Sequence, residues 1–150
     1  MQPRRESETS LRSKAHVADV MASDVKTING RDSAEHAWQT THRGGIPYLI
    51  VKRKDAIVGV LSARELGGPG GDAFRVGRRA DELMVRTVAT AQPSHTVRQA
   101  AVLMRHHSLA CLPVVSRGKL VGIVTNTDLV DLIARGDYAP APVVVPEHLG

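Results

Sequence analysis

Two short motifs place a hydroxyl side chain three residues before an acid: Thr125 with Asp128, and Ser62 with Glu65. A carboxylate at the start of a helix can accept hydrogen bonds from ligand hydroxyl groups, and the helix N-terminus favours an anion nearby. The same spacing also forms a capping box, in which the acid accepts a hydrogen bond from the first amide. Because a capping box prefers Glu or Gln, the pattern favours helix capping for Glu65 and ligand binding for Asp128.

The other reactive residue types form no pattern typical of catalysis or metal binding. Cys111 is the single cysteine and has apolar neighbours, which favours a packed core residue over a reactive thiol. His106 and His107 are adjacent, so on a helix they point about 100 degrees apart, and no Cys or His lies at zinc-site spacing. Residues 67–71 are glycine-rich but lack the Lys-Ser/Thr of a phosphate-binding loop. We predict no enzyme activity, no metal site and no required cofactor.

The formal net charge of +5 raises the question of nucleic-acid binding. The basic residues cluster in the N-terminal arm, around residues 52–54 and around residues 75–79, and the chain has only one Trp, two Tyr and one Phe. So few stacking groups, without a recognisable motif, favour solvated charge over a nucleic-acid interface. No apolar run approaches the roughly 18 residues that span a bilayer, so we predict a cytoplasmic protein without membrane attachment.

Hydrophobic periodicity predicts two similar series of elements. The first series has an extended stretch at 25–28, a helix at 33–42, strands at 48–52 and 56–61, and a short helix from 62. The second has an extended stretch at 88–91, a helix opened by a capping box at 96–99, strands at 111–115 and 119–124, and a helix from 125. On that last helix, Leu129, Leu132 and Ile133 form the predicted apolar side. The predicted fold class is α+β, with two βαββα repeats related by pseudo-two-fold symmetry.

An internal repeat supports this division. The pairs that recur at a spacing of 63 include Met21 and Met84, Thr27 and Thr90, and Gly59 and Gly122. Ile46-Pro47 matches Leu112-Pro113 at a spacing of 66 residues instead of 63. This predicts that the first repeat is three residues shorter than the second in its helix and three residues longer in its hairpin. The predicted limits are a flexible arm at 1–15, repeats at 16–67 and 79–136, a flexible Gly-rich connector at 68–78 and a Pro-containing tail at 137–150.

In order and spacing these pieces resemble a tandem pair of cystathionine-β-synthase (CBS) domains. The resemblance covers residues 17–136 and is carried by segments such as Leu120-Val121-Gly122-Ile123-Val124, followed by Thr125-Asn126-Thr127-Asp128-Leu129. It implies a Bateman-type module with two clefts between the repeats, usually assembled as a homodimer. Family members bind AMP, ADP, ATP or S-adenosylmethionine in such clefts and regulate another protein.

The resemblance also implies a set of ligand-binding residues. In the second repeat, Thr125 and Asp128 would contact ribose, while Val88, Thr90 and Pro113 would line the cleft. In the first repeat, the corresponding residues are Ser62, Glu65, Thr27 and Pro47, and Arg64 takes a position from which family members reach phosphate. We expect the Asp128 cleft to prefer adenosine-like ligands, and the Arg64 cleft to tolerate phosphate but bind ribose less well.

Two functions of different classes remain open. The first is a stand-alone regulatory module that binds an adenosyl ligand and signals to a partner protein that the sequence does not identify. The second is a constitutive dimerisation or scaffold protein with vestigial clefts. Two features favour it: Glu65 stands where the second repeat has Asp128, and the helix predicted at 33–42 has a weak helical pattern. Nucleic-acid binding ranks below both.

Overall fold

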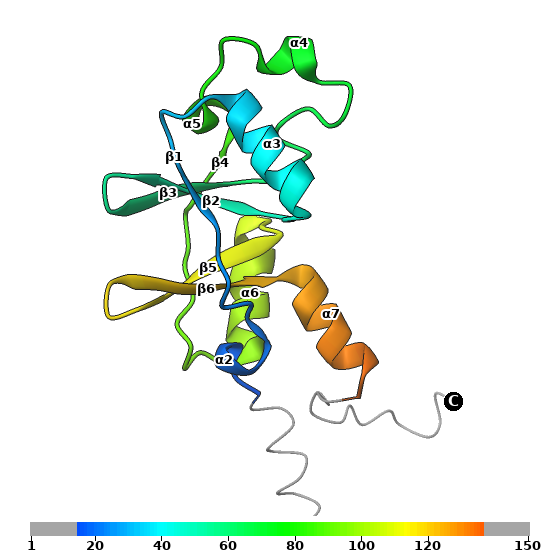
Figure 1. Ribbon diagram of the computed structural model, residues 1–150. Helices are drawn as coiled ribbons and strands as arrows, with labels where there is room; N and C mark the ends of the chain where they lie inside the picture. The colour runs from blue at the N-terminus through cyan, green and yellow to red at the C-terminus, as the bar shows by residue number, and fades with distance from the viewer. Residues whose placement is uncertain (1–14, 137–150) are drawn as a thin grey trace, which may run out of the picture. The chain divides into compact units, whose positions relative to one another are not determined.

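The structure is a computed structural model that describes residues 15–136. The chain forms two compact units (Figure 1). One comprises residues 22–90, and the other combines the described residues 15–21 with 91–136. The predicted tail at 137–150, and all but the last residue of the predicted arm at 1–15, lie outside the described residues.

The unit of residues 22–90 is built on a mixed four-stranded sheet. Its elements are β1 (Thr27–Asn29), α3 (Ala34–Gly44), β2 (Leu49–Arg53), β3 (Ala56–Leu61), α4 (Asp72–Arg75), α5 (Ala80–Leu83) and β4 (Val85–Arg86). The strand order is β1-β2-β3-β4, with β1 parallel to β2 and the other neighbours antiparallel. Leu49, Val51 and Leu61 are fully buried against Ala34 and Ala37 of α3, so the sheet and one helix face form the core.

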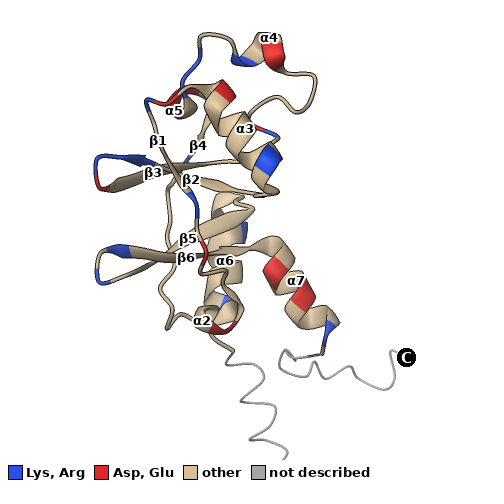
Figure 2. Ribbon diagram, viewed as in Figure 1, with Lys and Arg blue, Asp and Glu red and all other residues tan. Residues whose placement is uncertain are grey.

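The second unit is built on a β-hairpin. Its elements are α2 (Val17–Val20), α6 (Val97–His107), β5 (Cys111–Ser116), β6 (Lys119–Thr125) and α7 (Asn126–Ala134). β5 and β6 pair antiparallel, and Ala91 adds a parallel bridge to Val114. On α6, Val97, Ala100 and Met104 are buried. In each unit Lys and Arg lie near the turn of the hairpin, as Figure 2 shows.

One constant spacing of 63 residues relates the two repeats, which corrects the predicted spacing of 66. Helices α3 and α6 have 11 residues each, and both hairpin turns have a positive φ, at Lys54 and Arg117. The strand register agrees, since Ile28 pairs with Val51 and Ala91 pairs with Val114. Pro113 therefore corresponds to Ile50 rather than to Pro47, and the three-residue differences are absent.

Each compact unit contains the first helix of the other repeat. The Val17 amide at the start of α2 donates to the His95 carbonyl at 2.8 Å, and the Ala80 amide at the start of α5 donates to the Asp32 carbonyl at 2.8 Å. α2 thus packs with the second repeat and α5 with the first. The compact units therefore differ from the sequence repeats.

Three expected secondary-structure features differ in the structure. Residues 63–67 form a turn instead of a helix, because Gly67 and Gly68 have φ of 88° and 69°, outside the range of a right-handed helix. The extended stretch predicted at 88–91 is reduced to a single parallel bridge from Ala91 to Val114, and β4 at Val85–Arg86 is a separate strand that pairs with β3. On α7, Leu129 and Leu132 are buried but Ile133 is 57% exposed, so its predicted place on the apolar side is wrong.

The connector contains the short helix α4 and closes around the side chain of Arg75. This side chain is fully buried, with its Nε donating to Glu35 at 2.9 Å and its Nη2 to Asp72 at 2.7 Å. Its Nη1 donates to the carbonyls of Leu66 and Gly68, both at 2.8 Å. The guanidinium carbon also lies 4.4 Å from the centre of the Trp38 ring on α3, within cation–π range. One side chain thus joins the connector to α3.

Acidification should weaken the attachment of α5 through Asp81. The carboxylate is 5% exposed and accepts hydrogen bonds from Arg79 at 3.0 Å and Arg53 at 3.1 Å, while Glu82 lies 3.8 Å from Arg79. Burial by itself raises the pKa of Asp81, but the two arginine hydrogen bonds outweigh it and lower the pKa below the usual value. The stabilisation is therefore present above the ordinary Asp pKa and is lost as the pH falls through the lowered one.

The test is urea unfolding of the wild type and Asp81→Asn between about pH 5 and about pH 2. We expect the wild type to lose more stability on acidification, so that the difference between the two proteins narrows as the pH falls. A constant difference over this range would show that Asp81 is not responsible.

Candidate functional site

Thr125 and Asp128 form a reciprocal hydrogen-bonded pair where β6 passes into α7. Thr125 has an extended backbone, is 9% exposed and forms the N-cap of the helix. Its amide donates to Asp128 Oδ2 at 2.8 Å, and the Asp128 amide donates to Thr125 Oγ1 at 3.1 Å. The expectation that Asp128 fits a capping box poorly is wrong, because the strand-to-helix turn brings the short side chain close enough.

Capping occupies only one of the two carboxylate oxygens. No hydrogen bond within residues 15–136 uses Asp128 Oδ1, and the side chain is partly exposed. A carboxylate oxygen can accept more than one hydrogen bond, so this one can meet hydroxyl groups from outside the chain. The two alternatives considered for the motif are therefore compatible, with Oδ2 holding the helix and Oδ1 available to a ligand.

Pro113 lies on the same hairpin as this pair. It is buried on β5, its carbonyl accepts from the Ala91 amide at 2.9 Å, and its neighbours Leu112 and Val114 are fully buried. In the strand register Thr125 pairs with Cys111, and Cys111 lies two residues before Pro113 on β5. The hairpin therefore brings an apolar strand and the Thr125/Asp128 pair together.

Val88 and Thr90 lie on the chain segment that leads to Ala91. Both are exposed, and both belong to the unit of residues 22–90. No strand forms at either residue, although Ala91 directly after them is held by two backbone hydrogen bonds, with Pro113 and Val115. Their part in ligand binding stays a prediction.

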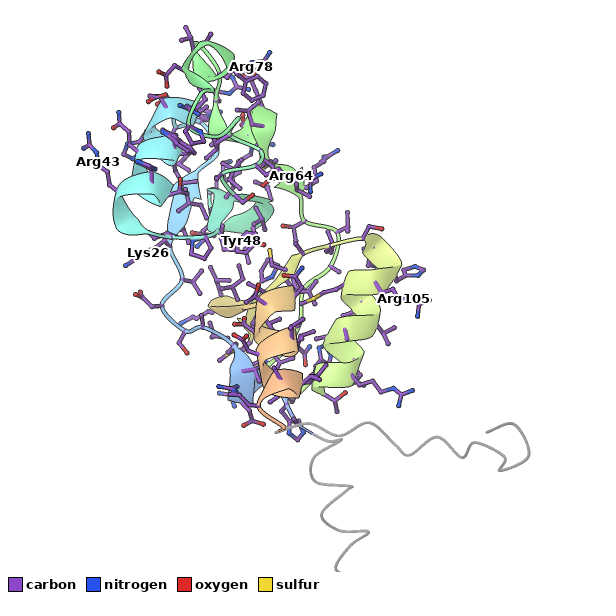
Figure 3. The ribbon with its side chains drawn as sticks, turned by 90° about the vertical axis from the view of Figure 1, so that its right-hand side faces the viewer. Lys26, Arg43, Tyr48, Arg64, Arg78 and Arg105 are labelled. Carbon is purple, nitrogen blue, oxygen red and sulfur yellow. The ribbon has the colours of Figure 1, made fainter. Side chains whose placement is uncertain are left out.

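In the first repeat, the Ser62 amide makes the predicted capping hydrogen bond to Glu65, but the reciprocal bond from the Glu65 amide to Ser62 Oγ is not formed within the described residues and no helix follows directly. Glu65 Oε1 accepts from the Ser62 amide at 2.7 Å and from Ser62 Oγ at 2.6 Å. Because the segment is a turn, it offers no helix N-terminus to attract an anion. Arg64 is exposed and makes no ion pair with any residue from 15 to 136 (Figure 3). The two motifs are therefore not equivalent in structure.

A hollow in the unit of residues 22–90 includes Pro47 and Ala63, the residue after Ser62. Its other lining residues include Trp38 and His42, whose rings stack with centroids 5.1 Å apart and an angle of 16° between planes. Thr27 lies elsewhere, exposed on β1 opposite Ile50. The aromatic pair did not enter the predicted site, although its spacing of four residues on a predicted helix indicates neighbouring side chains.

Between residues 15 and 136, no three His, Cys, Asp or Glu side chains come close enough together to hold a metal ion. In the same part of the chain, no helix has both the length and the apolar composition needed to cross a membrane.

Comparisons with known proteins identify the repeat. The family model described as "CBS domain" matches residues 17–66 and 80–135. An uncharacterized protein of Methanocaldococcus jannaschii is 29% identical over 126 residues, which are 82% of this chain and 44% of that protein. The chain spans less than half the length of the curated relatives that it matches.

Solved structures share the fold. The CBS domain pair of protein MJ0100, in complex with 5′-methylthioadenosine and S-adenosyl-L-methionine, has a TM-score of 0.69 at 23% identity, covering 81% of this chain and 98% of that chain. The cytosolic domain of the Mg²⁺ channel MgtE, in complex with ATP, has a TM-score of 0.63 at 26% identity, covering 87% of this chain and 54% of that chain. These matches confirm the prediction of a two-repeat CBS-pair fold.

Proposed function

Because the chain belongs to the CBS domain family through two tandem copies, we propose that it is a regulatory module that binds an adenosyl ligand and signals to a partner protein. The ligand is AMP, ADP, ATP or S-adenosylmethionine. The module itself carries out no reaction and works in the cytoplasm. It acts through a difference in ligand affinity between two conformations, since a ligand shifts an equilibrium only by such a difference.

The Thr125/Asp128 pair carries this proposal. Asp128 Oδ2 accepts a hydrogen bond at the start of α7, and in the proposed complex Oδ1 accepts from the ribose hydroxyls. Pro113 and its buried neighbours on β5 supply the apolar wall for adenine. That related CBS structures were solved with S-adenosyl-L-methionine and with ATP supports this choice of ligand class.

Replacement of Asp128 by Asn should weaken ligand binding while leaving the fold intact. The Asn carbonyl oxygen can still accept from the Thr125 amide, so α7 keeps its cap, but the negative charge that binds ribose is lost. A hydrogen bond to a charged group contributes about 1.5–3 kcal/mol, so we expect affinity to fall by about 10- to 150-fold. Calorimetric and thermal-shift titration with AMP, ADP, ATP and S-adenosylmethionine measures this.

Asp131→Asn is the matched control, because Asp131 is exposed on the same helix, outside the motif, and the substitution changes the charge equally. Glu65→Gln tests the first repeat, where we expect a smaller effect because its motif lies in a turn. Equal affinity of Asp128→Asn and wild type would remove Asp128 from the site. Failure of all four ligands to saturate the wild type at millimolar concentration would contradict the proposed function.

The scaffold alternative is supported by the missing helix after Ser62 and by the exposed apolar residues of α7. Val130 is 62% exposed and Ile133 is 57% exposed, which leaves an apolar surface for a second copy of the chain. We propose a homodimer under either function. Light scattering of the titrated samples tests for the dimer, and a dimer that binds none of the four ligands favours the scaffold.

A further inference from the structure

A hollow of about 520 Å³ lies in the unit of residues 22–90, between the start of α3 and the segment that follows α4. It shares no lining residue with the proposed adenosyl-binding residues. Arginines dominate it, with Arg31, Arg78 and Arg79 exposed around the opening and the buried Arg75 beneath them. The volume lies within the range of small-molecule sites.

Both acidic residues of this hollow already form ion pairs with Arg75. Glu35 and Asp72 are its two carboxylate-bearing residues, and each accepts a hydrogen bond from Arg75. Arg79 pairs with Asp81, which Arg53 on β2 shares, and its Nε also lies 3.8 Å from Glu82, so the charge of Arg79 is balanced as well.

Of the four arginines that line the hollow, Arg31 and Arg78 make no ion pair with any residue between 15 and 136. Their backbones are held in place, since the Arg31 amide donates to Asn29 Oδ1 at 2.8 Å and the Arg78 carbonyl accepts from the Ala34 amide at 2.8 Å. The Arg78 guanidinium lies 5.2 Å from the centre of the Phe74 ring, beside α4 (Figure 3). The first turn of α3 adds partial positive charge at the same hollow.

We propose that this hollow binds the phosphate group of a small phosphomonoester. A phosphomonoester carries about −1.5 to −2 charge at neutral pH, which matches the positive charges of Arg31 and Arg78, and guanidinium groups bind phosphate oxygens in pairs. The hollow has room beyond one phosphate group, and Val76 in its lining is 77% exposed and offers an apolar contact for the organic part. This site is additional to the adenosyl-binding residues and does not depend on them.

The test is an NMR titration of the full chain with inorganic phosphate and glycerol 3-phosphate at constant ionic strength. We expect saturable shifts of the amides of residues 31–35 and 76–79. The double variant Arg31→Ala/Arg78→Ala should bind glycerol 3-phosphate at least about tenfold more weakly, since each lost charged hydrogen bond costs about a decade of affinity or more. Both side chains are exposed, so circular dichroism should show an unchanged fold.

Arg98→Ala/Arg105→Ala is the matched control, because it removes two exposed arginines from α6 in the other unit and should leave binding unchanged. Asp128→Asn should also bind glycerol 3-phosphate like the wild type, which separates this site from the proposed function. Equal weakening by the two arginine pairs, or shifts that do not saturate, would overturn the proposal. Tighter binding of a phosphopeptide than of glycerol 3-phosphate would overturn the assignment to a small molecule.

Discussion

Replacement of Arg75 by Ala should destabilise the unit of residues 22–90 by about 2–4 kcal/mol. The substitution leaves the Leu66 and Gly68 carbonyls without their donor and removes the cation–π contact with Trp38. It also leaves a cavity where a fully buried side chain lay. Loss of the two ion pairs adds less to this destabilisation. The side chains of Glu35 and Asp72 are 45% and 86% exposed, so water solvates their carboxylates once the arginine is gone.

Urea unfolding and amide hydrogen exchange of residues 66–79 measure this effect. Arg78→Ala is the control, because Arg78 is an exposed arginine three residues away and should change stability by less than about 1 kcal/mol. Arg75→Lys should recover little stability, since one ammonium group lacks the planar fork that serves four acceptors. A loss no greater than that of Arg78→Ala would mean that the connector does not depend on Arg75.

Gly59→Ala should destabilise the same unit by about 1–3 kcal/mol. Gly59 lies on β3 opposite Arg86 of β4, and a Cβ there would collide with the Met84 side chain and lie 2.8 Å from the Val85 carbonyl oxygen. Methionine can move aside, but that oxygen belongs to the paired backbone of β4 and can move only if the strand separates. Glycine at this position therefore permits the close approach of β4 to the sheet.

Thermal and urea unfolding compare this variant with Gly70→Ala. An added Cβ at Gly70 meets no described atom within 4 Å, and we expect a change within about 0.5 kcal/mol there. Equal unfolding midpoints for the two variants would show that β3 and β4 tolerate a wider spacing than the structure has.

Local sequence patterns predicted the helices and strands well where the residues of the pattern themselves make the hydrogen bonds that stabilise the element. Thr96 and Gln99 form the predicted capping box of α6, and Thr125 begins α7 as predicted. The β2–β3 and β5–β6 hairpins formed close to the predicted limits. These features depend on residues within about four positions of one another, so the local sequence contains the information that specifies them.

The match of Pro47 to Pro113 failed because it rested on residue identity rather than on hydrogen bonding. In the structure, the pairing of Ile28 with Val51 and of Ala91 with Val114 sets the register, and both pairs obey the spacing of 63. Pro47 instead lines a hollow with Trp38 and His42. The structure thus removes the equivalence of Pro47 and Pro113 between the repeats. The part of each residue in ligand binding stays a prediction.

The sequence by itself determined the family, the two-repeat fold and the Thr125/Asp128 motif, because short-range patterns that recur twice in the same order specify them. Tertiary structure alone decided which compact unit α2 and α5 each join, that Arg75 is buried, and that residues 63–67 form a turn. Each of these depends on contacts between residues far apart in the chain, or on backbone conformations that only glycine adopts readily. Arg75 shows the difference most clearly, because its charge suggests an exposed residue, whereas the carbonyls and carboxylates that surround it in the fold make its burial favourable.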